Sequence, residues 1–94
     1  MNVRFYTDPG SDLPHIYNHS VEEEEVEEAL ARQGEDRQGR GDTRVAIGQT
    51  NAGRYLRVIY SRDLEPDSVF VITAYELQGK PLAAYLRRRR RRHQ

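Results

Sequence analysis

The chain has 94 residues and a mass of 11.0 kDa, the size of one domain, which excludes a multi-domain enzyme. It contains no cysteine, so it can form neither a disulfide framework nor a thiolate zinc site. No apolar run approaches the roughly 18 residues of a membrane span, and the first residues do not have the pattern expected of a signal peptide. We therefore expect a single cytoplasmic domain over residues 1–94, without a membrane partner.

The formal net charge of zero is the sum of two oppositely charged halves. Residues 1–42 hold 11 Asp and Glu against 4 Arg, whereas residues 43–94 hold 11 Lys and Arg against 4 Asp and Glu. An asymmetry of this kind indicates a charged partner rather than an inert surface. Leu, Ile, Val and Phe total 20, and 11 of them lie between Val45 and Leu77, which predicts a compact sheet in that region.

The N-terminal segment is rich in strand-forming residues. Residues 2–7 predict a first strand, and Asp8-Pro9-Gly10 predicts the turn that ends it. Residues 13–19 fit either a short returning strand or a single helical turn, and the pattern does not decide between them.

A helix is predicted from Val21 to about Gln33. Ser20 and Glu23 have the spacing of a capping box, and Gly34 suits the left-handed position that ends a helix. The glutamate-rich face has two interpretations, a solvated helix surface or a surface for a basic partner. Residues 35–43 are polar and rich in glycine, and we expect a loop there.

Three further strands are predicted at about 44–50, 54–62 and 68–76. A three-residue loop between the first two would place Ile47 opposite Arg57, whereas a four-residue loop places it opposite Leu56. The four-residue loop keeps one face dry and is therefore predicted. Phe70, Ile72 and Ala74 should join that face from the third strand.

The opposite face of this predicted sheet has two interpretations. Small side chains opposite Tyr55 and Arg57 would leave a shallow trough. The trough is either the ordinary outer face of an antiparallel sheet or a groove that binds phosphate. Its predicted members are Arg44, Ala46, Gly48, Tyr55, Arg57, Ile59, Val69, Val71, Thr73 and Tyr75.

A C-terminal helix is predicted from Lys80-Pro81, with Leu82, Tyr85 and Leu86 at helical spacing. It leads into six consecutive arginines, 87–92, which repel one another, so we expect residues 87–94 to form a basic tail that frays. Arginine beside aromatic residues is typical of nucleic-acid binding. The alternatives are an acidic protein partner, the chain's own acidic helix, and solubility or membrane-surface contact.

The residues that could carry chemistry fit one reaction class. No Walker loop, dinucleotide fingerprint or serine elbow is present, and His15 and His19 lack a third metal ligand nearby, which favours a structural role and no metal or other cofactor. Transphosphorylation of RNA needs only charge stabilisation and two proton transfers. The candidate catalytic residues are Arg57, Tyr75, Lys80, Tyr85 and Glu76, with Glu76 ranked below Tyr75 because alternation turns it toward the core. The candidate RNA-binding residues are Arg44, Arg54, Tyr55, Arg87, Arg88, Arg89 and Arg90.

Several short segments carry a family resemblance. They are residues 19–30, 45–50, 53–60, 71–75 and 85–88, with Gly-Arg-x-Leu-Arg-Val at 53–58 as the most specific piece. Over roughly residues 15–90 the chain resembles the BrnT-like and related DUF4258 proteins of bacterial type II toxin–antitoxin systems. The resemblance implies an α+β, RelE-like fold, with a small antiparallel sheet, one helix from the N-terminal half on one face and a short C-terminal helix.

That resemblance also implies a function, a metal-independent endoribonuclease toxin of the mRNA interferase type. Its partners would be RNA and a small cognate antitoxin, often with a ribbon-helix-helix DNA-binding part. The alternative is a non-catalytic module of the same fold that binds RNA or a protein partner. A further hypothesis is a homodimer held together by the acidic helix and the basic tail.

Overall fold

The structure is a computed structural model that describes residues 1–63, 65 and 67–92. Its elements, in chain order, are β1 (Asn2–Phe5), the 3₁₀ helix η1 (His15–His19), α1 (Glu23–Ala31), β2 (Gln33–Gln38), β3 (Thr43–Gln49), β4 (Tyr55–Arg62), β5 (Ser68–Glu76) and α2 (Gly79–Arg92). The strands form one sheet in the order β1-β5-β4-β3-β2. The α+β class is confirmed, but the sheet is mixed, because β1 runs parallel to β5.

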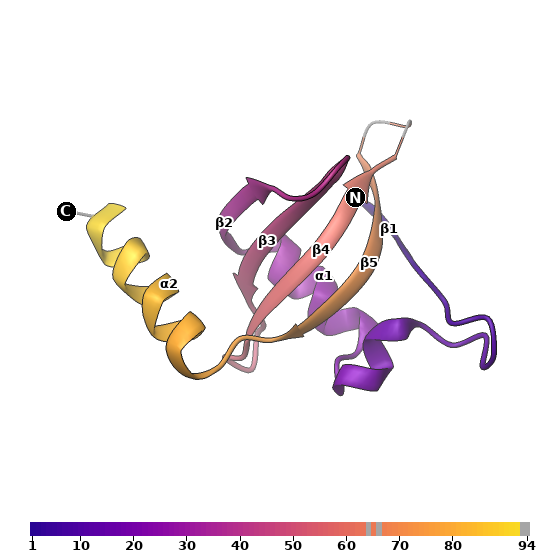
Figure 1. The fold of residues 1–94 in the computed structure, drawn as a ribbon, viewed down its shortest axis with the longest axis horizontal. Helices are drawn as coiled ribbons and strands as arrows, with labels where there is room; N and C mark the ends of the chain where they lie inside the picture. The colour runs from indigo at the N-terminus through magenta and orange to yellow at the C-terminus, as the bar shows by residue number, and fades with distance from the viewer. Residues whose placement is uncertain (64, 66, 93–94) are drawn as a thin grey trace.

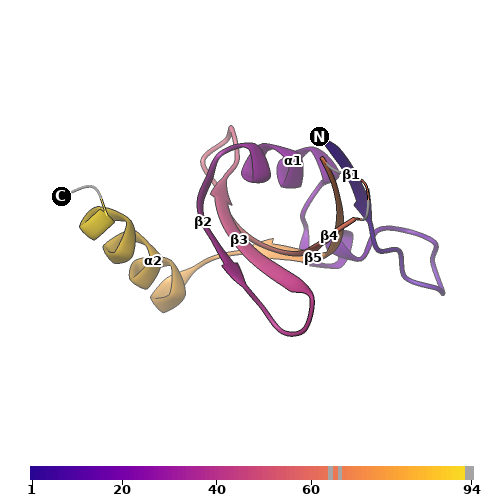
Figure 2. The ribbon, with the colours of Figure 1, turned by 90° about the horizontal axis from the view of Figure 1, so that it is seen from above.

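The sheet is strongly curved around α1. Figure 2 shows the strands bending about this helix, while α2 extends away from the sheet on the outside. Figure 1 shows α1 behind the sheet and η1 beside the C-terminal half of β5. The main core fills the concave side and consists of Ile16, Val21, Val26, Ala29, Leu30, Ala46, Leu56, Val58, Tyr60, Val69, Val71 and Ala74.

The open alternative at residues 13–19 is a helical turn, His15–His19. Ser20 ends this turn in the left-handed conformation, with φ of 57°, so it cannot begin the next helix as predicted. Helix α1 begins instead after Glu22, whose backbone N–H donates to Oε1 of Glu25 at 3.0 Å. The predicted capping residues are wrong by two positions, because Ser20 already ends η1.

Residues 33–38 form an edge strand rather than the end of a helix and the start of a loop. Strand β2 pairs antiparallel with β3. Gly34 does not end α1; a Cβ atom there would lie 1.8 Å from the hydroxyl oxygen of Tyr85. The loop prediction for residues 35–38 was wrong because backbone pairing with β3 forms this strand without apolar side chains of its own.

Strands β3 and β4 pair in the register of a three-residue loop, and the prediction of a four-residue loop is wrong. A three-residue loop, 51–53, joins them and is closed by a hydrogen bond between the backbones that flank it. Val45 therefore lies opposite Ile59, and Ile47 opposite Arg57. The prediction assumed one dry face, whereas this sheet buries apolar residues on both faces.

A bulge in β5 also changes which side chains face α1. The pairing with β4 skips Ile72, and the alternation of inward and outward residues shifts by one position there. Val69 and Val71 enter the main core with Ala74. The prediction for Ala74 is confirmed, and that for Phe70 and Ile72 is wrong.

The outer face accordingly differs from the predicted trough. Gly48 faces α1, where a Cβ atom would lie 1.9 Å from the carbonyl oxygen of Ala29. Arg44 and Ala46 share that face by alternation, so none of these three lies beside Arg57.

A second, smaller core lies under α2. Ile47, Leu77 and Tyr85 are buried in it, with Tyr55, Leu82 and Leu86 packed around them. The predicted apolar stripe of the C-terminal helix is therefore confirmed. The helix continues through Arg92; fraying of the basic tail stays a prediction, and residues 93 and 94 lie outside the described part of the chain.

Candidate functional site

The candidate site is centred on Arg57, on the outer face of β4. Tyr75 lies opposite it on β5, and Nη1 of Arg57 donates to the Tyr75 hydroxyl oxygen at 3.4 Å. Both side chains are half-buried. Ile47 flanks Arg57 on β3. The guanidinium therefore lies between β3, which α2 covers on its outer side, and β5, which lies beside η1.

Arg57 differs from the other half-buried arginines of the described chain. Arg44, Arg54 and Arg88 each form an ion pair with a carboxylate at 2.7 to 2.9 Å. Arg57 has no carboxylate within ion-pair distance among the described residues, and its buried Nε has no hydrogen-bond partner there. A partly desolvated cation without a counter-charge is costly, so an anion bound to it would be stabilising.

Two other predicted site residues pair with each other on the helix side. Arg54 donates to Glu25 at 2.7 Å and to Glu76 at 3.1 Å. The hydrogen bond to Glu25 raises the pKa of Arg54 despite burial, and Glu76 raises it further. Burial opposes ionisation of Glu25, but the backbone of Glu22 and the Arg54 side chain hold the pKa of Glu25 below its usual range. Glu76 therefore does not point toward Arg57.

Tyr85 and Lys80 lie on α2 in different surroundings. Tyr85 is buried in the second core, with 1% of its surface exposed, and its ring lies 5.8 Å from that of Tyr55 between centroids. Lys80 is exposed in the first turn of α2. Burial makes Tyr85 a packing residue in this arrangement.

Arg44 belongs to a separate polar cluster. It donates from Nε to Asp36 at 2.7 Å, and the Tyr60 hydroxyl donates to the same carboxylate. The bond to Asp36 raises the pKa of Arg44. Burial, followed by the bond to Asp36, raises the pKa of Tyr60. This cluster joins β2 to the core side of β3 and β4.

The arginines at 87–91 on α2 differ in their contacts. Arg88 grips Glu35 of β2 with two hydrogen bonds, at 2.9 and 3.0 Å. Nη1 of Arg89 donates to the Tyr55 hydroxyl at 3.4 Å. Arg87, Arg90 and Arg91 are exposed and have no carboxylate within ion-pair distance among the described residues. The helix thus carries a basic surface next to the outer face of the sheet.

A row of aromatic rings approaches Tyr75 from the N-terminal segment. The rings of His19 and Tyr75 have centroids 5.9 Å apart, and those of His15 and His19 are 5.3 Å apart. Nδ1 of His15 donates to Asp8 at 2.9 Å, and this bond lowers the pKa of Asp8. The sequence predicts a structural role for the two histidines. Their spacing can be read from the sequence, but their position beside β5 depends on a long-range contact.

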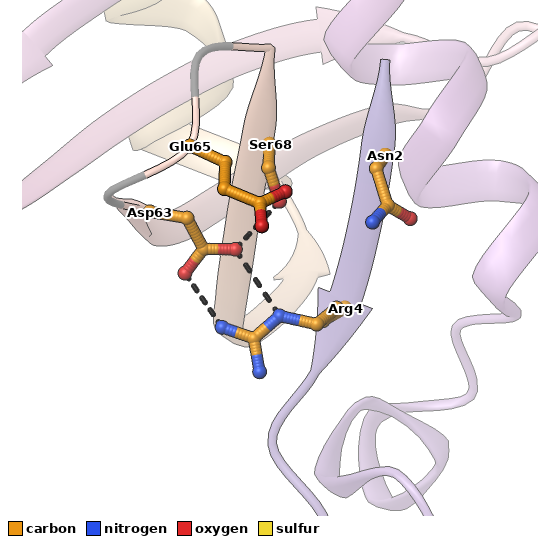
Figure 3. A pocket seen from close by; sticks show the side chains of 5 residues that line it. All are labelled: Asn2, Arg4, Asp63, Glu65 and Ser68. Carbon is orange, nitrogen blue, oxygen red and sulfur yellow. Dashed lines mark hydrogen bonds and ion pairs between the residues drawn. The ribbon is translucent and has the colours of Figure 1, made fainter.

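An ion pair between Arg4 of β1 and Asp63, which follows β4, lies at one edge of the sheet. Figure 3 shows Arg4 gripping Asp63, with Ser68 also donating to that carboxylate. The Arg4–Asp63 distance is 2.6 Å, and Arg4 also lies over the ring of Phe70. The Arg4 guanidinium is already paired within its own chain, so this ion pair serves to hold β1 on the sheet.

Some glutamates of α1 form contacts within the fold, and others are exposed. Glu25 pairs with Arg54, and Glu28 accepts from the backbone N–H of Asn51. Tyr17 donates to Glu23 at 2.8 Å, and the carboxylate raises the pKa of Tyr17. The glutamates left exposed on this face are Glu22, Glu24 and Glu27. Both interpretations of the remaining face, solvated or partner-binding, stay open.

Within the described residues, there is no group of three or more acidic, histidine or cysteine side chains arranged to hold a metal ion. In the same part of the chain, no helix is long and apolar enough to cross a membrane. No protein-family model, curated protein or solved structure matches this chain. The resemblance to BrnT-like proteins and to the RelE-like fold therefore stays a prediction.

Proposed function

We propose that this protein binds RNA on the outer face of its sheet and cleaves it by transphosphorylation. The observation that carries the proposal is Arg57, a half-buried guanidinium without a carboxylate partner among the described residues. Its planar fork matches the geometry of a phosphate. In a setting partly withdrawn from water, an electrostatic contact of this kind is stronger than one at the open surface.

The chemistry required is within reach of these side chains. The 2′-oxygen of the substrate attacks phosphorus, the bond from phosphorus to the 5′-oxygen breaks, and a 2′,3′-cyclic phosphate results. Arg57 stabilises the negative charge that develops on the phosphoryl oxygens. The Tyr75 hydroxyl accepts from Arg57, so its own proton is free to pass to the leaving 5′-oxygen.

Helix α2 supports binding of an extended strand next to this site. Its exposed arginines, with Arg89 beside Tyr55, combine positive charge with an aromatic ring on which a base can stack. Such contacts hold the backbone without reading its sequence. Arg44 and Arg54, which are already paired with carboxylates, are poorer candidates for RNA contact.

The proposal includes the cellular role that the family resemblance implies. The protein acts as the toxin of a type II toxin–antitoxin pair, and a small antitoxin, of the ribbon-helix-helix type in many such pairs, masks the basic outer face. Its expression in bacteria is expected to arrest growth, and co-expression of the protein encoded next to it to restore growth. Growth arrest that persists with a cleavage-deficient variant would contradict this role.

A non-catalytic RNA-binding module is the second candidate. It is favoured by the surroundings of two members of the predicted catalytic set, since Glu76 pairs with Arg54 and Tyr85 is buried. This candidate keeps the basic surface and needs no proton transfer.

The test compares an RNA oligonucleotide with the same oligonucleotide carrying 2′-deoxyribose at every position. Transphosphorylation requires the 2′-hydroxyl, so only the RNA should be cut, and its fragments should end in a 2′,3′-cyclic phosphate and a 5′-hydroxyl. Cleavage of both substrates would contradict the reaction. Binding of both without cleavage would favour the second candidate.

A further inference from the structure

We propose that His19 is a catalytic proton-transfer residue of the Arg57 site and that Asp8 and His15 are its positioning residues. The inference rests on the proposed function, because it assigns the base that transphosphorylation requires. It is carried by the row of rings that runs along η1 to β5.

The row is continuous from the N-terminal segment to the site. Tyr6 and His15 have ring centroids 6.3 Å apart, His15 and His19 5.3 Å, and His19 and Tyr75 5.9 Å. The contact between the two histidines is edge to face, at an interplanar angle of 76°, a geometry that aromatic rings favour. Tyr75 in turn contacts Arg57, so His19 stands one ring away from the guanidinium.

The far end of the row is fixed by a carboxylate. Asp8 accepts from Nδ1 of His15 with one oxygen and from the side-chain amide of Asn18 with the other, both at 2.9 Å. A carboxylate on Nδ1 selects the tautomer and the ring orientation of a histidine. Asp8 therefore fixes the orientation of the His15 ring, and His19 packs against that ring.

His19 itself is exposed. Within the described chain it makes ring contacts with His15 and Tyr75 but no side-chain hydrogen bond. Both its ring nitrogens are thus open to a substrate. Imidazole is the side chain whose ordinary titration lies between about pH 5 and 8, where a base must both accept and release protons.

His19 and Tyr75 together account for the two proton transfers of the reaction. Neutral His19 takes the proton of the 2′-hydroxyl as the bond between the 2′-oxygen and phosphorus forms. Tyr75 gives its proton to the 5′-oxygen as the bond from phosphorus to that oxygen breaks. Solvent returns the proton from His19 to the Tyr75 phenolate, and Arg57 offsets the charge of that phenolate meanwhile.

The kinetic test uses His19→Gln and Asp8→Asn, with Tyr17→Phe as a matched control on η1. We expect His19→Gln to lower the cleavage rate by about 10²-fold or more and to remove one ionisation from the pH profile of that rate. Asp8→Asn should cost less, about tenfold, and displace the profile along the pH axis. Unchanged rate and profile in a folded His19→Gln protein would overturn the inference while leaving the proposed function intact.

A second readout does not depend on cleavage. The NMR signal of the His19 ring is followed while uridine 3′-monophosphate is added to the full chain and to Arg57→Ala. We expect the signal to shift in the wild type and to stay in place in Arg57→Ala. A shift without any RNA cleavage by the wild type would keep His19 in the Arg57 site and refute the proposed function; no shift would overturn the placement of His19 itself.

Discussion

The two faces of the curved sheet use arginine in opposite ways. On the face toward α1, Arg54 lies between Glu25 and Glu76, and Arg44 is bound to Asp36. On the outer face, Arg57 has only a tyrosine hydroxyl as its polar partner among the described residues. The first arrangement links elements of the fold, whereas the second keeps a cation available. The inner arginines therefore act on stability and the outer one on anion binding.

The largest effect on stability is expected at Gly48, where the inner face of the sheet is in close contact with α1. In Gly48→Ala the new Cβ would lie 1.9 Å from the Ala29 carbonyl oxygen, a backbone atom that cannot rotate away. Helix α1 must shift, and we expect the free energy of unfolding to fall by about 3 kcal/mol, as measured by urea denaturation. Gly10→Ala is the control, since nothing lies within 4 Å of its added Cβ. Equal stability of both variants would contradict the close contact.

Truncating the two arginines tests the comparison itself. Arg54→Ala leaves Glu25 and Glu76 without their shared partner, and we expect a loss of about 2 kcal/mol of unfolding free energy. Arg57→Ala removes no ion pair of the described chain, so its loss should stay below about 1 kcal/mol, mostly from the buried stem. Denaturant unfolding of both proteins measures the difference; a larger loss for Arg57→Ala would reverse the assignment of the two faces.

The basic surface of α2 should appear in the salt dependence of RNA binding. Changing Arg87, Arg89 and Arg90 to Gln removes three charges next to the outer face, and the slope of log affinity against log salt should fall by about 2. The control changes Arg32, Arg40 and Arg62, which are exposed elsewhere, to Gln. The same fall in slope for the control would show that RNA does not prefer the α2 side.

The smallest effect concerns acid stability at the β1 edge. The hydrogen bond from Arg4, followed by that from Ser68, lowers the pKa of Asp63. A carboxyl whose pKa is lower in the folded chain stabilises the fold above its ordinary pKa of about 3.9 and loses that contribution as the pH falls through the lowered value. Melting temperatures should therefore fall more steeply below about pH 4 in the wild type than in Asp63→Asn. Parallel pH curves would contradict the role of this pair.

Sequence patterns predicted the strands and the C-terminal helix where local signals are strong. Strands β3, β4 and β5 carry alternating apolar residues, and the stripe of Leu82, Tyr85 and Leu86 marks α2. Strand β2 was missed because its sequence, QGEDRQ, has no apolar residue. Its pairing is set by its neighbour rather than by its own composition.

The register and the site depended on contacts between distant segments. The rule of one dry face failed at Ile47, which α2 buries on the outer side. Arg57 and Tyr75 were predicted together and do meet, since they occupy facing positions of paired strands. The histidine row could not be predicted, because nothing local places η1 beside β5.

The most direct measurement compares RNA cleavage by Arg57→Ala and Arg62→Ala. Both changes remove one arginine from β4, but Arg62 is exposed at the strand's end. Loss of the phosphate-binding donor should lower the single-turnover rate of Arg57→Ala by about 10²- to 10³-fold, while Arg62→Ala stays within a fewfold of the wild type and both remain folded. Equal cleavage rates for the two folded variants would contradict the assignment of the site to Arg57.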